Sequence, residues 1–229
     1  MDGIRLRVFP LIRPIFIAAA VACAIACAGS AVLAQKGAPM IAIETMDIGA
    51  APVDFDFGLT GQGRPGQWVI TRDASATGGR AIEQSSADRT DNRFPLAIYK
   101  PFSAKNVDVS VRFKAVAGSV DRAGGVALRL VDPNNYYVAR ANALEDNVRF
   151  YRVSNGRRIE IAGANLKVST NEWHTLGLKA EGESFTVTFD GKELYRATDK
   201  SITAAGRVAL WTKADSVTRF DRIEIKTLP

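Results

Sequence analysis

The segment Asp132-Pro-Asn-Asn-Tyr-Tyr-Val-Ala-Arg140 decides the fold of this chain of 229 residues. Its first four residues are a turn signal, and they separate two apolar runs, Gly124–Val131 and Tyr136–Ala141. Short runs rich in β-branched and aromatic residues and bounded by turn residues are typical of neighbouring β-strands. The segment therefore predicts strands joined by a tight turn.

The rest of the chain repeats this pattern. In Val107–Phe113 every second residue is apolar, which buries one face of a strand and leaves the other in water. Asn155-Gly156 and Asp190-Gly191 are hairpin signals, because these residues tolerate the positive φ angles of a type I′ turn. No window after residue 34 has a sustained helical period. Further strand-like runs are found at Gln67–Arg72, Arg80–Gln84, Leu96–Lys100, Asn147–Val153, Arg158–Ala162, Thr175–Ala180, Phe185–Phe189, Glu193–Ala197, Arg207–Thr212 and Phe220–Lys226. So many short strands predict an all-β fold, a two-sheet antiparallel jelly-roll sandwich.

The first 34 residues have the pattern of an export signal. Three Arg residues precede the apolar run Ile15–Ala28, and Val32-Leu-Ala34 supplies the small residues that a signal peptidase requires. The apolar run is short and rich in Ala, so no membrane span is predicted after cleavage. We therefore predict a signal peptide over residues 1–34 and a periplasmic or secreted protein. A retained anchor, or a lipoprotein acylated at Cys23 or Cys27, is the alternative interpretation.

Cleavage would change the composition of the protein. Both cysteines lie within the signal, so the exported protein would have no disulfide and no thiol nucleophile. The signal also carries three Arg and one Asp, so the formal charge falls from +6 to +4, too small an excess to predict nucleic-acid binding. Residues 35–52 are predicted to be a lead-in or an edge strand. Residues 53–229 are predicted to be a single β-sandwich domain, because turn signals recur without a break in composition.

Several motifs resemble one group of exported bacterial domains. Besides Gly124–Arg140 they are Trp173-His-Thr-Leu176, Phe189-Asp-Gly-Lys-Glu-Leu194, Gly206-Arg-Val-Ala-Leu-Trp211 and Phe220-Asp221. Together they resemble the concanavalin A-like and laminin-G-like jelly-roll domains, and within that group the 3-keto-disaccharide hydrolase domain. The resemblance implies the jelly-roll fold and a glycoside hydrolase acting on a disaccharide or modified sugar. Lectins and binding modules share the architecture, so the resemblance leaves the activity open.

The alternation within strands predicts which polar residues share one face. If Val126 and Leu128 point into the core, Arg129 points outward, and the same argument turns Arg149, Tyr151 and Trp211 outward. The predicted ligand-binding residues are Arg129, Tyr137, Arg140, Arg149, Tyr151 and Trp211, with Tyr136 as the alternative to Tyr137.

Such a face suits a carbohydrate partner. Aromatic rings bury the C–H face of a sugar, and the guanidinium fork donates paired hydrogen bonds to hydroxyl or carboxylate groups. Several Arg residues together favour an acidic sugar or a polyanionic glycan. A solvated sheet face, with Trp211 covered by a loop, is the alternative interpretation.

No catalytic carboxylate motif is recognisable. Glu181-Gly-Glu183 is the nearest candidate, and it lies at a turn between two strands, where a solvated hairpin explains it. Glycosidases need two carboxyl groups about 5–9.5 Å apart. Sequence spacing does not exclude a pair from distant strands, such as Asp132 with Glu145 or Asp146.

Calcium is the one metal that the sequence suggests. Asp132, Asn134 and Asp221 are candidate ligands, because carboxylate and amide oxygens suit Ca²⁺. The same turn residues also form an ordinary β-turn without a metal. No other cofactor is predicted.

Three classes of function remain. An exported glycan-binding protein is the leading hypothesis, and it predicts aromatic rings exposed on a concave sheet. A glycoside hydrolase predicts two carboxyl groups that face each other across a groove. A structural or protein-interaction domain of the cell envelope predicts a flat surface without a groove. The missing catalytic motif favours binding.

Overall fold

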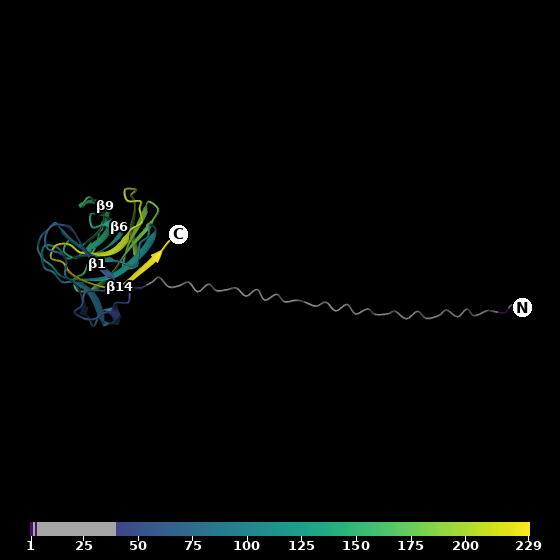
Figure 1. The fold of residues 1–229 in the computed structure, drawn as a ribbon. Coiled ribbons are helices and arrows are strands. Elements are labelled where there is room, and N and C mark those ends of the chain that lie inside the picture. Colours follow the sequence, from purple (N-terminus) through teal and green to yellow (C-terminus); the bar gives the residue numbers. More distant parts are fainter. Residues whose placement is uncertain (2, 4–39) are drawn as a thin grey trace. The chain divides into compact units, whose positions relative to one another are not determined.

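The computed structural model describes Met1, Gly3 and residues 40–229. The predicted signal peptide and the start of the predicted lead-in therefore lie almost wholly outside the described residues. The described part contains fourteen strands and two short 3₁₀ helices, η1 (Ile43–Thr45) and η2 (Thr77–Gly79) (Figure 1). The strands are β1 (Phe55–Gly61), β2 (Trp68–Arg72), β3 (Arg80–Gln84), β4 (Arg93–Tyr99), β5 (Val107–Ala117), β6 (Ala123–Asp132), β7 (Asn135–Asn142), β8 (Asn147–Ser154), β9 (Arg157–Asn165), β10 (Trp173–Glu181), β11 (Ser184–Phe189), β12 (Lys192–Thr198), β13 (Arg207–Trp211) and β14 (Val217–Thr227).

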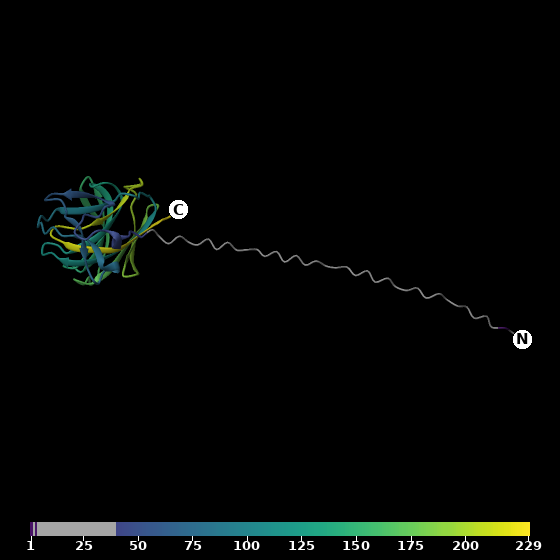
Figure 2. The same ribbon diagram turned by 60° about the horizontal axis from the view of Figure 1, so that its bottom comes forward.

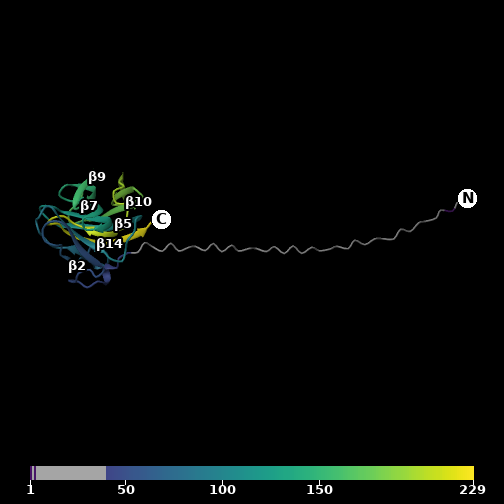
Figure 3. The ribbon, with the colours of Figure 1, turned by 45° about the horizontal axis from the view of Figure 1, so that its top comes forward.

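The strands form two antiparallel sheets of seven strands each (Figures 1 and 2). The first sheet has the order β1-β4-β13-β6-β7-β8-β9, and the second has the order β12-β11-β10-β5-β14-β3-β2. Neighbours in the sheets are often distant in sequence, as β5 and β14 are (Figure 3). The predicted all-β, two-sheet jelly-roll sandwich is confirmed.

The core between the sheets follows from alternation along the strands. Val107, Val109 and Val111 of β5 are fully buried and belong to this core, whereas the residues between them lie on the wet face. From the first sheet, Tyr137 and Ala139 of β7 enter the same core. Burial of this apolar surface is the dominant force that holds the cysteine-free sandwich together.

A second apolar cluster covers the opposite face of the first sheet, which we call the outer face. It contains Tyr136 and Val138 of β7, Tyr151 of β8 and Trp211 of β13, together with Phe94 of β4. Because these residues alternate with core residues on the same strands, they point away from the second sheet. The first sheet thus carries apolar side chains on both of its faces.

The segment before β1 contains no regular strand within its described residues. Met40 forms one isolated bridge with Glu224, and the Ile41 amide donates to the Ile223 carbonyl of β14. Ile43 then begins helix η1 and is buried in the core. The lead-in is therefore packed against the sandwich from residue 40 onward. Across the described residues, no helix is both long enough and apolar enough to cross a membrane.

Candidate functional site

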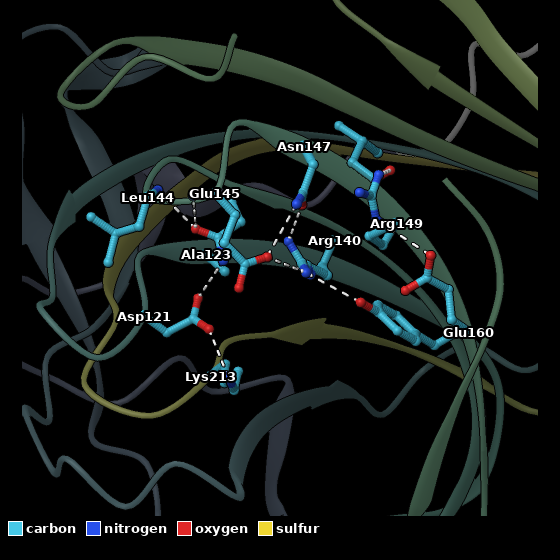
Figure 4. A network of polar contacts seen from close by, with 12 residues as sticks. Asp121, Ala123, Arg140, Leu144, Glu145, Asn147, Arg149, Glu160 and Lys213 are labelled. Atoms are coloured by element: carbon cyan, nitrogen blue, oxygen red, sulfur yellow. Dashed lines mark hydrogen bonds and ion pairs between the residues drawn. The ribbon is translucent and has the colours of Figure 1, made fainter. Parts of the chain in front are cut away.

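Arg140 is the centre of a polar cluster on the outer face of the first sheet (Figure 4). Its Nη2 donates to Glu145 Oε2 at 2.8 Å and to the Tyr151 hydroxyl at 3.2 Å, and its Nη1 donates to Asn147 Oδ1. Asn147 Nδ2 in turn donates to Glu145 Oε2 at 3.1 Å. We call these four residues the Arg140 cluster. Its members hold one another in fixed orientations.

Burial and charge act in opposite directions within the Arg140 cluster. Arg140 is 4% exposed, whereas the Glu145 side chain is 47% exposed. Burial alone would lower the pKa of Arg140, but Tyr151 and Glu145 raise it above its ordinary value. Burial likewise raises the pKa of Glu145, but Arg140 and Asn147 more than offset this and leave that pKa below its ordinary value. Glu145 is thus a carboxylate that faces solvent beside a buried guanidinium.

The loop between β7 and β8 places Glu145 over Arg140. Asn142 Oδ1 accepts hydrogen bonds from the Leu144 amide at 2.8 Å and the Glu145 amide at 3.2 Å. Asp146 then adopts a φ of 49°, the left-handed conformation that Asp tolerates better than most residues. The chain therefore reverses within a few residues and returns Asn147 to the same face as Arg140.

A second charged group adjoins the Arg140 cluster through Asn142. Asn142 Nδ2 donates to Asp121 Oδ1 at 3.0 Å. Lys213 Nζ lies 2.9 Å from Asp121 Oδ2 (Figure 4). The same Nζ lies 2.8 Å from Asp91 Oδ1. Asp121 is 2% exposed, and this burial raises its pKa above the ordinary value even though Lys213 opposes the shift. Burial alone would lower the pKa of Lys213, but Asp91 and Asp121 more than offset this effect and leave that pKa above its ordinary value.

Arg149 lies on the same outer face, and its side chain extends across the edge strand β9. Its Nε lies 3.3 Å from Glu160 Oε1, and its Nη1 donates to the Ala164 carbonyl at 2.9 Å. Gly163 permits this course, because a Cβ at that position would lie 2.3 Å from Arg149 Cδ. Arg149 is therefore paired with a carboxylate, as Arg140 is.

The aromatic residues of the outer face are buried beneath a guanidinium. Trp211 is fully buried, and its ring stacks on Phe94 with centroids 5.4 Å apart. The Arg158 Cζ lies 4.4 Å from the Tyr151 ring centroid and 5.0 Å from that of Phe94. Arg158 Nη1 is buried and has no hydrogen-bond partner among the described residues. The aromatic rings are thus packed beneath other side chains, and they are not exposed for a sugar ring to stack on them.

The structure places four of the six predicted ligand-binding residues on the outer face. They are Arg140, Arg149, Tyr151 and Trp211. Their position on one sheet face agrees with the alternation of the sequence, whereas their role in binding stays a prediction. The expectation of exposed aromatic rings is wrong, because Phe94 and Arg158 cover Trp211 and Tyr151.

The prediction for Tyr137 is wrong, because Tyr136 and not Tyr137 lies on the outer face. Tyr137 belongs to the core between the sheets, where its ring packs against Phe185 with centroids 4.4 Å apart. Its hydroxyl donates to Asp199 Oδ1 at 2.5 Å and accepts from the Ile202 amide at 3.0 Å. In a pair of adjacent Tyr residues, the sequence period alone does not decide which one faces the core.

The prediction for Arg129 is also wrong, because a β-bulge changes the phase of β6. The register with β7 shifts between Leu128 and Asp132, and Arg129 adopts a φ of 48°. Its guanidinium donates to the carbonyls of Lys105 at 2.8 Å, Ile202 at 3.0 Å and Gly182 at 2.5 Å. Arg129 therefore fastens three loops and lies away from the Arg140 cluster.

The three predicted calcium ligands do not converge. Asp132 Oδ1 accepts a hydrogen bond from the Asn134 amide within the turn between β6 and β7. Asp221 lies on β14 of the other sheet, where its Oδ2 accepts from the Thr77 amide at 2.6 Å and from Arg112 at 3.2 Å. Within residues 40–229, no group of three or more His, Cys, Asp or Glu side chains is arranged to hold a metal. Calcium binding at the Asp132 turn alone stays a prediction.

Sequence reasoning missed several polar residues of the outer face. Asn147 shares the parity of Arg149 and Tyr151, so alternation could have placed it there. Glu145 was considered only as a partner of Asp132 in a carboxylate pair, and Asp121 was not considered. Both residues lie in or beside loops, where no strand period operates. Their contacts with Arg140 and Lys213 depend on loop conformations that only the folded chain defines.

A comparison of the amino-acid sequence with models of known protein families agrees with this fold. The model described as "Galactocerebrosidase, C-terminal lectin domain" matches residues 100–228, which is more than half of the chain. The chain belongs to this family. The match to this lectin-domain family begins after β4 and includes every strand that contributes to the Arg140 cluster. No curated protein sequence matches the chain.

Solved structures share the fold of this member of the lectin-domain family. The carbohydrate-binding module CBM66 from Bacillus subtilis is 22% identical with a TM-score of 0.59, over 75% of this chain and 95% of the module. The β-glucanase of Bacillus licheniformis is 13% identical with a TM-score of 0.54, over 85% of this chain and 100% of the enzyme chain. A Bacillus subtilis protein of unknown function with a galectin-like fold is 8% identical with a TM-score of 0.53, over 75% of this chain and 89% of the other. At these identities the similarity establishes the fold alone.

Proposed function

We propose that this protein binds glycans through the Arg140 cluster on the outer face of the first sheet. The observation that carries the proposal is the fixed array of donors and acceptors around Arg140, which is half open to solvent at Glu145. Sugar hydroxyls both donate and accept, so they pair with a carboxylate, an amide and a phenol held in place. The lectin-domain family and the carbohydrate-binding module of the same fold support this proposal.

The charge balance of the outer face favours a neutral glycan there. Arg140 is paired with Glu145, Arg149 with Glu160, and Lys213 with Asp91 and Asp121. An incoming carboxylate would have to compete with these protein carboxylates, whereas hydroxyl groups would only extend the hydrogen-bond network. The acidic sugar expected from the number of Arg residues is therefore not the ligand that we propose for this face.

A glycan array followed by calorimetry tests the proposal. The wild-type domain should bind at least one neutral oligosaccharide, and Glu145→Gln should weaken the affinity by about tenfold, the equivalent of ~1.4 kcal/mol. The matched control is Glu193→Gln, because Glu193 also pairs with an Arg, Arg196, but lies on β12 of the other sheet. Absence of binding to every glycan by the wild type would contradict the proposal, as would equal losses in the two variants.

A second candidate function is hydrolysis of a glycosidic bond, as the resemblance to 3-keto-disaccharide hydrolases implies. Asp121 and Glu145 lie on one face, with the pKa of Asp121 raised by burial and the pKa of Glu145 lowered by Arg140. Opposite shifts of two carboxyl groups are a mark of acid and base pairs in glycosidases. However, both oxygens of Asp121 already contact Asn142 and Lys213, which favours binding over hydrolysis.

Release of reducing sugar from a 3-keto-disaccharide would separate the two candidates. A hydrolase should lose turnover in Asp121→Asn and in Glu145→Gln and keep it in Glu193→Gln. A binding protein should release no sugar in any form, while the wild type and Glu193→Gln retain glycan affinity.

We also propose that the protein is exported to the periplasm or secreted and that residues 1–34 are removed. The support is the sequence pattern of residues 1–34, in which Arg residues precede a short apolar run and small residues. Expression in a bacterial host and mass spectrometry of the recovered protein test this directly. A new N-terminus at Gln35 is expected, and an intact N-terminus or an acylated Cys23 or Cys27 would contradict it.

A further inference from the structure

A sizeable cavity lies between two loops and not on the outer face. It has a volume of about 660 Å³ and is lined by the β1–β2 loop, including Gly63, Arg64 and Gln67, and by the β3–β4 loop, including Ser86, Asp88 and Thr90. It shares no lining residue with the Arg140 cluster. We call it the loop cavity. Its volume falls within the range of about 300–1,000 Å³ that is common for small-molecule sites.

A buried guanidinium fixes the walls of the loop cavity. Arg93, at the start of β4, is fully buried, and its Nε donates to the Arg64 carbonyl at 2.6 Å. Its Nη2 donates to the Pro65 carbonyl and to Ser86 Oγ, both at 3.0 Å, and its Nη1 donates to the Ala214 carbonyl at 2.5 Å. One side chain thus joins both cavity loops to the loop that precedes β14. The cavity is therefore shaped before any ligand arrives.

Asp88 joins the two loops a second time. Its Oδ2 accepts from the Arg64 amide at 2.9 Å, and its Oδ1 accepts from the Thr90 amide at 3.0 Å and the Thr90 hydroxyl at 2.7 Å. These hydrogen bonds hold the pKa of Asp88 well below its usual range. Asp88 is therefore an ionised carboxylate whose acceptor capacity is largely taken up by the protein itself.

Two lining side chains remain without a partner among the described residues. The guanidinium of Arg64 forms no hydrogen bond and no ion pair there, and only the backbone atoms of Arg64 are engaged. The side-chain amide of Gln67 is likewise unengaged, since only its backbone is hydrogen-bonded. The positive charge of Arg93 and the negative charge of Asp88 balance each other. The positive charge of Arg64 therefore has no balancing carboxylate at the cavity wall. A ligand that fits this wall carries one anionic group and several hydroxyl groups.

We infer that the loop cavity is a second binding site and that it takes an acidic sugar. The sugar carboxylate pairs with the Arg64 guanidinium, which presents the planar fork that a carboxylate matches. The sugar hydroxyls exchange hydrogen bonds with the Gln67 amide and with the polar loop residues Ser86 and Thr90. The site is separate from the neutral-glycan face, and each can bind whether or not the other does.

Titrations of ¹⁵N-labelled protein with D-glucuronate, D-glucose and sodium sulfate, followed by NMR, test the inference. D-Glucuronate should shift the side-chain signals of Arg64 and Gln67 and saturate. D-Glucose and sulfate should each bind at least tenfold more weakly. Equal binding of glucose would show that Arg64 does not select the carboxylate. Equal binding of sulfate would show a plain anion site, and either result would overturn the inference.

Two charge-matched variants locate the site. Arg64→Gln should weaken glucuronate binding at least tenfold, whereas Arg89→Gln should leave it unchanged, because Arg89 is exposed in the β3–β4 loop but does not line the cavity. Gln67→Ala should weaken binding without a change in net charge. Equal losses in Arg64→Gln and Arg89→Gln would reduce the effect to overall charge and contradict the inference. Glu145→Gln should leave glucuronate binding intact, so a failure of the Arg140 proposal is distinguishable from a failure here.

Discussion

Glu145 Oε2 lies 2.8 Å from Arg140 Nη2, and this ion pair joins a half-exposed carboxylate to a buried guanidinium on the outer face of the first sheet. The two residues are separated by only five positions, yet they belong to a strand and to the loop that follows it. In this arrangement the carboxylate stays half open to solvent, whereas both terminal nitrogens of the guanidinium are hydrogen-bonded within the protein. An external ligand would therefore meet the acceptor of this pair first.

Acid should weaken the ion pair between Glu145 and Arg140. The pKa of Glu145 is lower in the folded protein than in the unfolded chain, so its contribution to stability is complete above the unfolded pKa, near 4.3. That contribution is lost as the pH falls through the lower, folded pKa. We expect the melting temperatures of wild type and Glu145→Gln to differ at pH 7 and to converge as the pH falls through the folded pKa of Glu145. A difference that does not shrink in acid would contradict this assignment.

Lys213 should be essential for the charge of Asp121. Lys213→Met leaves the buried carboxylate of Asp121 without its cation, and removal of one partner of a buried pair costs about 3–5 kcal/mol. Urea unfolding measures this loss. The double variant Asp121→Asn with Lys213→Met should recover part of the stability, because no unpaired charge is left. Additive losses in the double variant would show that the two groups do not interact.

Trp211 should contribute to the stability of the fold. Trp211→Ala removes a fully buried ring between Phe94 and Arg158, and large-to-small core substitutions of this kind cost about 3–5 kcal/mol. Trp211→Phe keeps an aromatic ring and should cost less, although the hydrogen bond to the Tyr136 hydroxyl is lost. Thermal unfolding distinguishes the two variants. A melting temperature for Trp211→Ala equal to that of the wild type would show that the ring is dispensable.

Tyr137→Phe tests whether Tyr137 stabilises the core and takes no part in ligand binding. Burial raises the pKa of Tyr137 to about 12, so its hydroxyl stays protonated and donates to Asp199 while it accepts from the Ile202 amide. Loss of the hydroxyl leaves the partly buried Ile202 amide without its acceptor and should cost about 1 kcal/mol of unfolding free energy. Glycan binding should not change. A loss of binding with unchanged stability would return Tyr137 to the ligand site.

The fold was predictable from the sequence because strand periodicity is local. Val107–Phe113 and the hairpin signals at Asn155 and Asp190 each predict their structure from a few neighbouring residues. Strand β1 was not predicted, although Phe55, Phe57 and Leu59 alternate with polar or small residues. It lies at the edge of the first sheet, and its exposure does not follow this alternation, because Phe55 is buried whereas Phe57 is exposed.

The candidate site was predictable only in part. Alternation placed Arg140, Tyr151 and Trp211 on one face, since their strands keep phase with the core. It failed at Arg129, where the register shift between Leu128 and Asp132 changes the side to which the side chains of β6 point. It could not reveal that Phe94 and Arg158 cover the rings, because these residues come from strands distant in sequence.

The clamp formed by Arg93 has a consequence for how the two surfaces respond to acidity. A guanidinium remains charged at every pH at which this domain is folded, and the carboxylate of Asp88 titrates only in strong acid. The walls of the loop cavity therefore keep their shape as a compartment acidifies. Beside the Arg140 cluster, in contrast, burial holds the pKa of Asp121 above its ordinary value. As the pH falls, the charge pair of Asp121 with Lys213 is therefore lost before the hydrogen bonds of Asp88 that shape the loop cavity.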